Sequence, residues 1–351
     1  MDKTRRELLM AGSAAFLSTA ATAPAFAATA TNDTRGPRGA ARDGRAAAGA
    51  DPASGSTVQQ GSWRDPQRSR EIPWRLRMPG GDQPVALVVF SHGLGGSLDG
   101  GTEWAQAWAD AGMATLHLQH AGSDRAIWAS GPRGVKAAAS AEQLMARGQD
   151  VQFAVSELLR LQQLGEGPWR RVRPDALGMS GHSFGAQTTL AVAGRDFQVA
   201  SAPDLTESHF KAFAAFSPAA GLFSGGLKGI TRPMLCLTGS LDGNPLGQER
   251  TGDYRRAVYT ALPAGAKAQL WLEGADHMTF GGGGERGAGF GQRLLGRQRE
   301  QAPQTLAAHH TYLIKAVTTD WWRARLLDDE EATRRLKSPK GLAAGDEWEQ
   351  G

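Results

Sequence analysis

The sequence predicts an α/β fold in which helices flank a mostly parallel central sheet. From about residue 61 onward, short apolar runs typical of buried strands alternate with longer stretches of helical spacing. Glycine is frequent, with 46 residues, as expected for a chain with many strand-to-helix turns. The length of 351 residues is also sufficient to bury the core of one large α/β domain.

The expected strands and helices alternate along the chain. A continuous apolar run at residues 85–90 is the first expected strand of the parallel sheet. Further strands are expected at residues 114–118, 175–180, 212–216, 234–238 and 268–272. Helices are expected at residues 103–111, 139–164, 186–193 and 305–327. The last helix is amphipathic, and the residues expected on its buried face are Leu313, Ile314, Val317, Trp321 and Trp322.

Two segments are longer than ordinary connections, residues 120–139 and the glycine-rich residues 281–291. Long loops at the carboxyl ends of strands are where open α/β folds bind ligands. Each segment is therefore a candidate for a small cap over a site. A mobile surface loop is the alternative, and it fits the glycine-rich segment equally well.

The first 27 residues resemble an export signal and are excluded from the predicted fold. Arg5 and Arg6 precede a modest apolar stretch that ends in Ala25-Phe26-Ala27, a small-x-small cleavage site. Paired arginines in this setting resemble a twin-arginine signal, which implies recognition by the twin-arginine export machinery. Polar residues interrupt the stretch, leaving too little apolar length for a transmembrane anchor. We expect cleavage near Ala27, a periplasmic or extracellular protein, and no stable membrane anchor after cleavage.

Composition divides the rest of the chain into three parts. Residues 28–60 are rich in small and polar residues without apolar periodicity, which predicts a disordered tether. Residues 61–330 are expected to form the folded domain, and the charged tail at residues 331–351 is expected to fray. The net charge of +4 is small and scattered, which argues against nucleic-acid binding. The single cysteine, Cys236, excludes an intramolecular disulfide and is expected to be buried in a strand.

The most informative motif is Gly181-His182-Ser183-Phe184-Gly185, which lies between an apolar strand and a helical run. A G-x-S-x-G sequence in this setting forms a sharp turn that holds its serine in a strained conformation, and the glycines avoid clashes there. The helix that follows directs its N-terminus at whatever Ser183 attacks. The motif and its flanks predict a serine hydrolase with the α/β-hydrolase fold.

A serine nucleophile needs a base, and the base needs an acid to hold its tautomer. In α/β-hydrolases these follow in the order serine, acid, histidine. Asp242 comes directly after the expected strand at residues 234–238, and His277 lies in the loop after the next strand. Asp276 is a weaker candidate because adjacent side chains rarely point at one another, and Asp253 lies within the next helical segment. We therefore predict Ser183, Asp242 and His277 as nucleophile, acid and base.

Hydrolysis of an ester also needs donors for the developing oxyanion. One is expected to be the backbone N–H of Phe184, directly after the nucleophile. The other is expected to be the N–H of Leu94, in the glycine-rich loop Ser91-His92-Gly93-Leu94-Gly95-Gly96. This loop lacks the Lys-Ser/Thr of a phosphate-binding P-loop. His92 is expected to brace the loop, and His182 is expected to pack beside the turn.

Metal and cofactor sites are not expected. His117 and His120 are separated by two residues, and on a strand this spacing would direct them to opposite faces. No cluster of carboxylates or cysteines completes a site around them. The sequence therefore predicts catalysis without a metal or cofactor.

These motifs resemble the branch of α/β-hydrolases that contains platelet-activating-factor acetylhydrolase and the predicted dienelactone hydrolase-like esterases. The likeness is densest at residues 90–96, at residues 181–186 and at His277-Met278-Thr279-Phe280, and it spans roughly residues 83–325. It implies an oxyanion hole made by the amides of Leu94 and Phe184. True dienelactone hydrolases use a cysteine nucleophile, so Ser183 argues against a dienelactone substrate. No evident interfacial helix follows the signal, which argues against a phospholipid.

The predicted activity is that of a secreted carboxylester hydrolase that acts, through an acyl-enzyme, on small or lipid-like esters with short to medium acyl groups. Candidate pocket residues are Trp104, Trp128, Phe223, Met278 and Phe280, with ordinary core packing as the alternative for each. Alternatives among enzymes are an acetylhydrolase or phospholipase of the platelet-activating-factor type, a polyester hydrolase, and a peptidase or amidase. A non-catalytic binding protein on the same fold is the alternative from another class.

Overall fold

The computed structural model describes residues 49–50, 55–198, 202–220, 226–245, 249–283 and 304–351. All of them belong to one compact unit, Arg45–Gly351. The predicted export signal, most of the predicted tether, Phe223 and most of the glycine-rich segment lie outside the described residues. Within the described residues, no helix combines the length and apolarity that crossing a membrane requires.

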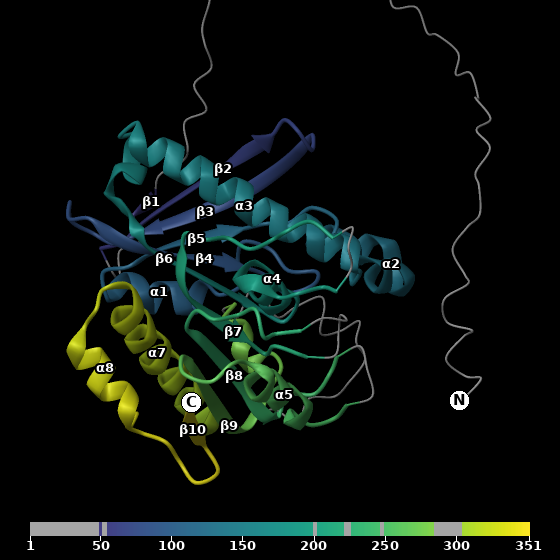
Figure 1. The fold of residues 1–351 in the computed structure, drawn as a ribbon, viewed down its shortest axis with the longest axis vertical. Helices are drawn as coiled ribbons and strands as arrows, with labels where there is room; N and C mark the ends of the chain where they lie inside the picture. The colour runs from purple at the N-terminus through teal and green to yellow at the C-terminus, as the bar shows by residue number, and fades with distance from the viewer. Residues whose placement is uncertain (1–48, 51–54, 199–201, 221–225, 246–248, 284–303) are drawn as a thin grey trace, which may run out of the picture. The chain divides into compact units, whose positions relative to one another are not determined.

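One sheet of ten strands organises the described part of the chain (Figure 1). The strands are β1 (Gly49–Ala50), β2 (Thr57–Asp65), β3 (Arg70–Met78), β4 (Val85–Ser91), β5 (Ala114–Leu118), β6 (Val172–His182), β7 (Phe210–Phe216), β8 (Met234–Leu241), β9 (Lys267–Asp276) and β10 (Glu347–Gln350). Their order across the sheet is β1-β2-β3-β5-β4-β6-β7-β8-β9-β10. The strands from β5 to β9 in this order pair in parallel. The remaining strands pair antiparallel at the two ends. The predicted mostly parallel sheet is confirmed.

Helices cover both faces of the sheet, as the α/β prediction requires (Figure 1). The α-helices are α1 (Thr102–Asp110), α2 (Gly131–Ala138), α3 (Ala141–Gln163), α4 (Phe184–Gly194), α5 (Asp253–Ala261), α7 (Gln304–Leu326) and α8 (Glu330–Lys337), and the short 3-10 helices are η2 (Arg125–Ser130), η3 (Gly167–Arg171) and η4 (Thr279–Gly281). Apolar residues of α3, α4 and α5 form one core with the sheet. Those of α1, α7 and α8 form a second core on the opposite face.

The buried strand β4 shows why its sequence is continuously apolar. Leu87 and Val89 contribute to the core beneath α3 and α4, whereas Val88 and Phe90 contribute to the core beneath α1 and α7. A strand covered on both faces has no solvent side and therefore no polar alternation. The predicted buried face of α7 is also confirmed, because its five predicted residues are at most 2% exposed.

The folded domain begins earlier than residue 61. Strand β2 starts at Thr57, within the predicted tether, and pairs along its whole length with β3. The sequence prediction contains neither strand. The side chains of β2 are mostly exposed or half-buried and largely polar, so β2 lacks an apolar run. Trp63 of β2 nevertheless packs against Trp74 and Trp169, with ring centroids 5.3 and 5.2 Å apart. These aromatic contacts join the antiparallel edge to the core.

The prediction of a frayed C-terminus is wrong. Helix α8 begins after Asp329, whose carboxylate accepts the Ala332 N–H at 2.9 Å as an N-cap. Strand β10 then pairs antiparallel with β9, and Trp348 donates its indole N–H to the Leu336 carbonyl at 2.7 Å. The prediction was based on the high density of charged residues at 331–351. The N-cap of α8, the pairing of β10 with β9 and the buried side chains of Ala332 and Leu336 nevertheless hold this segment in a regular structure.

Candidate active site

Ser183 lies at the turn between β6, which ends at His182, and α4, which begins at Phe184. Its backbone has φ 57° and ψ −111°, a conformation that L-residues rarely adopt. A strained non-glycine residue is retained when its surroundings hold it there, and such residues concentrate at functional sites. The predicted strained turn is therefore present at Ser183.

The two glycines of the motif are required by close backbone approach. A Cβ atom at Gly185 would lie 1.9 Å from the Ser91 carbonyl oxygen. A Cβ atom at Gly181 would lie 2.4 Å from the Gly185 oxygen. Because backbone atoms cannot move aside as a flexible side chain can, only glycine fits at either position. The turn is thereby pressed against the end of β4, where the glycine-rich loop begins.

Three side chains from different elements form one hydrogen-bonded chain. Ser183 Oγ lies 2.9 Å from Nε2 of His277, and Nδ1 of the same ring lies 2.8 Å from Oδ1 of Asp242. Asp242 follows β8, and His277 follows β9, the adjacent strand of the sheet. The structure thus brings together the three residues that the sequence predicts as nucleophile, acid and base. Ser183 is half-buried and the His277 side chain is 13% exposed, so the chain ends near solvent.

Asp242 is fully buried and surrounded by donors. Its Oδ2 atom accepts from Ser217 Oγ at 2.5 Å and from Thr238 Oγ1 at 2.9 Å. Its Oδ1 atom accepts from His277 and lies 2.9 Å from Nε of Arg255. Burial alone would raise the pKa of this carboxyl, but donation from His277 and the charge of Arg255 outweigh burial and lower the pKa. Asp242 is therefore an anion in the folded protein.

Two serines with positive φ serve this site. Ser217, at the end of β7, has φ 54° and donates to Asp242, while Ser183 has φ 57°. Ser217 is also held by donation of its N–H to the Leu237 carbonyl at 2.7 Å. Nothing in the sequence around Ser217, which precedes Pro218, indicates that its hydroxyl donates to the acid.

His182 braces the loop that carries His277. Its Nε2–H donates to the backbone carbonyl of His277 at 2.8 Å, and the two ring centroids are 4.8 Å apart. Burial, with a smaller contribution from the neighbouring His277, lowers the pKa of His182 to about 3, so this ring is neutral. The prediction that His182 packs beside the turn is confirmed, and its hydrogen bond adds a role in positioning His277.

The glycine-rich loop lies directly against Ser183. A Cβ atom built on Gly93 would lie 3.5 Å from the Ser183 Cβ. Leu94 packs against the cluster that contains Phe184. His92 donates from Nδ1 to the Gly93 carbonyl at 2.6 Å and accepts the His120 N–H at Nε2, 3.1 Å away. The bracing predicted for His92 is confirmed, whereas oxyanion donation by the Leu94 and Phe184 amides stays a prediction.

A buried arginine that the sequence did not reveal connects this loop to α4. Arg147 of α3 donates to Ser91 Oγ at 2.9 Å and to the His92 carbonyl. It also donates to Thr188 Oγ1 of α4 at 2.9 Å, and its guanidinium lies 4.7 Å from the Phe184 ring centroid. Burial lowers the pKa of Arg147 to about 9, so it is a cation at neutral pH. One side chain thus fixes both segments from which oxyanion donors were predicted.

A second Ser-His-Asp arrangement supports the same loop from inside. His120 contacts Ser91 Oγ through Nε2 and Asp150 Oδ2 through Nδ1, each at 2.9 Å. Asp150 also pairs with Arg68 and Arg70 at 2.8 and 2.6 Å. Ser91, His120 and Asp150 are all at 0% exposure, so no substrate can reach them. This array is a buried polar network that supports the loop.

The described residues contain no group of three or more His, Cys, Asp and Glu that could hold a metal ion. His117 donates to the Gly100 carbonyl at 3.0 Å, while His120 binds Ser91 and Asp150, so the two histidines serve separate partners. Cys236 is buried in β8, and burial raises the pKa of its thiol to about 12.

The predicted pocket residues divide into core and surface. Trp104 and Phe280 are 1% and 0% exposed and belong to the core beneath α1 and α7, so their prediction as pocket walls is wrong. Trp104 donates to the Phe280 carbonyl at 3.1 Å, which joins α1 to the segment after His277. Met278 is 41% exposed beside His277, and half-buried Trp128 packs with Leu94 and donates to Gly95. These two remain available to a substrate, and Phe223 lies outside the described residues.

The segment at residues 120–139, a candidate cap, forms η2 and α2. Ile127, Val135 and Ala138 bury their side chains together, with Leu94 packed against them. Asp124 caps η2 by accepting the Ala126 N–H at 3.2 Å, and the Arg125 N–H donates to the Gly96 carbonyl at 2.8 Å. The segment is therefore an ordered support of the glycine-rich loop.

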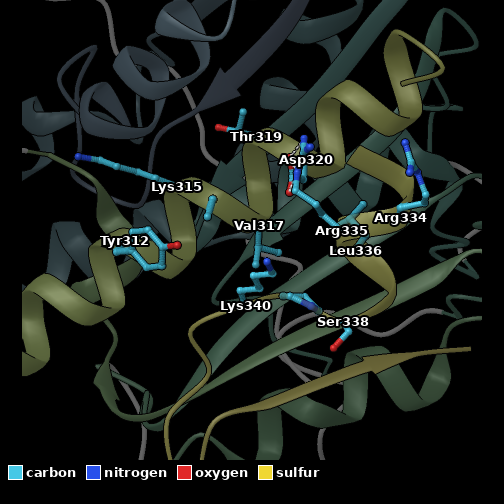
Figure 2. Close-up of a pocket in the computed structure, with 12 residues that line it drawn as sticks. Tyr312, Lys315, Val317, Thr319, Asp320, Arg334, Arg335, Leu336, Ser338 and Lys340 are labelled. Atoms are coloured by element: carbon cyan, nitrogen blue, oxygen red, sulfur yellow. Dashed lines mark hydrogen bonds and ion pairs between the residues drawn. The ribbon is translucent and has the colours of Figure 1, made fainter. Parts of the chain in front are cut away.

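A separate surface hollow of about 630 Å³ lies between α7 and α8 (Figure 2). None of the predicted site residues lines it. Four cations line it, and three of them, Lys315, Arg334 and Arg335, are paired with Glu103, Glu331 and Asp320, respectively, while the fourth is Lys340. Most of the positive charge of the hollow is therefore compensated, and the described residues that line it form no hydrogen-bonded chain that could activate a nucleophile.

Comparison with known proteins finds no family model that matches the chain and no curated protein that matches its sequence. The functional interpretation rests on the contacts around Ser183, Asp242 and His277.

Proposed function

We propose that the protein is a serine carboxylester hydrolase with the α/β-hydrolase fold. The observation that supports this most is the chain from Ser183 Oγ through both ring nitrogens of His277 to buried Asp242, at a strained strand–helix turn. The three residues follow β6, β8 and β9 in the order serine, acid, histidine, which is the order in α/β-hydrolases.

In the proposed reaction, Ser183 Oγ attacks the ester carbonyl carbon while His277 Nε2 takes the hydroxyl proton. Asp242 keeps the other proton of the ring on Nδ1 and stabilises the imidazolium that forms. The backbone N–H groups of Leu94 and Phe184 stabilise the tetrahedral oxyanion. The alcohol departs with the proton from His277 and leaves an acyl-Ser183. Water, deprotonated by His277, then attacks the acyl carbon and releases the acid and Ser183.

The surroundings of Ser183 favour soluble esters with short or medium acyl groups. Within the described part of the chain, few large apolar residues near the proposed site are accessible, with Met278 at 41% and Leu241 at 57% exposure. The ordered η2–α2 segment carries Arg125, Arg133 and Lys136 on its exposed or half-buried positions. A lipase that acts at an oil surface needs a broad apolar patch instead. We further propose that the chain is exported by the twin-arginine machinery through residues 1–27, which places the reaction in the periplasm or outside the cell.

A panel of p-nitrophenyl esters from acetyl to palmitoyl tests this function, with a phospholipid and an aliphatic polyester alongside. The wild-type protein should hydrolyse the soluble esters, with kcat/KM highest between acetyl and about octanoyl. The Ser183→Ala protein should lose activity by about 10⁵-fold or more while it keeps its fold, as measured by circular dichroism. An inactive wild-type protein would overturn the proposal, and equal activity of both proteins would reject Ser183 as nucleophile.

A further inference from the structure

Arg255 is a buried cation in contact with both the predicted acid and the predicted base. It lies in the first turn of α5 and is 3% exposed. Its Nε atom is 2.9 Å from Asp242 Oδ1, and its Nη2 atom is 3.1 Å from Nδ1 of His277. No sequence motif indicated this residue, because only the folding of α5 against β8 brings it to the site.

Backbone carbonyls fix the guanidinium in place. Arg255 donates to the carbonyl oxygens of Ser217 at 2.7 Å, Asp242 at 2.8 Å and Gly243 at 3.0 Å. These acceptors belong to the ends of β7 and β8, so one side chain ties together the loops that hold the acid. The Tyr254 ring also lies 4.8 Å from the guanidinium. With its N–H groups so engaged, Arg255 cannot swing away from His277 as a surface arginine would.

Among the residues that the structure describes, few charged groups face the His277 ring. Asp242 and Arg255 contact Nδ1, and His182 is neutral and donates to the His277 backbone. The neighbouring Asp276 carboxylate accepts from the N–H groups of Met278 and Thr279 within its own turn. On the α5 side, burial raises the pKa of Tyr254 to about 12, so it is uncharged, and Glu249 accepts from Asn244. Of the charges on the described residues, those of the Asp242 anion and the Arg255 cation therefore act most strongly on the His277 ring.

We propose that Arg255 is a positioning residue that holds Asp242 and, through its charge, sets the lower pH limit at which His277 acts as a base. This inference rests on the proposed hydrolase function. His277 must be neutral to take the proton of Ser183. The negative charge of Asp242 favours the imidazolium, whereas the fixed positive charge of Arg255 opposes it. Without Arg255, the uncompensated anion would keep His277 protonated to higher pH.

The test compares pH profiles of kcat/KM on p-nitrophenyl acetate for wild type, Arg255→Met and Arg255→Lys between pH 4 and 9. In Arg255→Met, the acid limb should move to higher pH by about one unit or more, with much of the activity regained in the alkaline range. In Arg255→Lys, which keeps the charge, the limb should stay close to that of wild type. Arg256→Met is the matched control, because Arg256 neighbours it on α5 but pairs with Glu347 at the surface.

Several results would overturn the inference while leaving the proposed function intact. One is an active Arg255→Met protein with the same acid limb as wild type, or with an equal loss at every pH. Another is an Arg255→Lys protein whose limb shifts as far as that of Arg255→Met. If Arg255→Met does not fold, Arg255→Gln takes its place, since glutamine retains amide donors for the loop carbonyls, and the same outcomes apply. A wild-type protein without esterase activity would instead reject the proposed function itself.

Discussion

The acid of a catalytic histidine does two things: it holds the active tautomer of the ring, and it supplies a negative charge. Replacement of Asp242 by asparagine separates these two effects. Every group in contact with the carboxylate is a donor: Ser217 and Thr238 at Oδ2, His277 and Arg255 at Oδ1. An asparagine must direct its NH₂ group at one of these pairs. The two hydroxyls can rotate and accept, whereas a guanidinium has no acceptor. The NH₂ group should therefore face Ser217 and Thr238, and the oxygen should continue to accept from His277 Nδ1–H.

The variant should thus keep the active tautomer of His277 and lose mainly the negative charge. Two unit charges about 4 Å apart interact by about 4 kcal/mol at an effective dielectric constant of about 20. Since each 1.4 kcal/mol or so is a factor of about ten in rate, kcat/KM should fall about a thousandfold. The loss for His277→Ala should be larger, about 10⁵-fold, because that variant has no base at all.

Steady-state hydrolysis of p-nitrophenyl acetate at pH 8 measures these losses, with circular dichroism as the check on folding. Loss of the Asp242 charge also leaves Arg255 buried without its anion, so the variant should unfold at lower denaturant concentration than wild type. If Asp242→Asn loses as much activity as His277→Ala while folded, its asparagine has reversed the tautomer and the reasoning fails. A loss of less than about tenfold would show that the Asp242 charge contributes little to the reaction.

Three further predictions concern chemistry, substrate and pH. Activity should survive EDTA and thiol reagents, because the described residues hold no metal-binding group and Cys236 is buried; inhibition that zinc or calcium reverses would contradict this. Hydrolysis of p-nitrophenyl esters should show no jump above the critical micelle concentration, and a sharp rise on emulsified triglyceride would indicate a lipase. Burial and the nearby Arg75 lower the pKa of His117 to about 3, so between about pH 6.5 and 3 the unfolded chain binds a proton that the folded protein does not. This proton lowers the free energy of unfolding by up to about 1.4 kcal/mol per pH unit, and urea titrations of His117→Gln should therefore show a shallower fall on acidification than wild type.

The parallel part of the sheet could be predicted because burial on both faces produces continuous apolar runs. Strand β5 was predicted with its observed bounds, and β4 to within one residue. The antiparallel edges lack this signal: β2 is mostly polar, and β10 follows a charged helix. Their stability depends on pairing with neighbours distant in the sequence, which no local pattern reports.

The hydrogen-bonded chain of the site was predictable because each of its members follows a strand, and parallel strands place their carboxyl ends at one edge of the sheet. Arg147 and Arg255 were not predictable in this way. Each is one arginine among many in a helical stretch, and its contacts arise only when that helix packs against loops far away in the sequence. Trp104 and Phe280 were predicted to line the pocket but lie in the core. The sequence alone does not show whether an aromatic residue near a site motif faces the substrate or the core.

Covalent labelling with a fluorophosphonate tests the proposed nucleophile most directly. Such a probe reacts with a serine only when a neighbouring base activates it. Intact-mass analysis should show a single adduct on the wild-type protein, and peptide mapping should place it on Ser183. Ser183→Ala should show no adduct, and His277→Ala should react far more slowly. A wild-type protein that stays unlabelled, or that is labelled at another residue while Ser183 remains free, would contradict the proposed hydrolase mechanism.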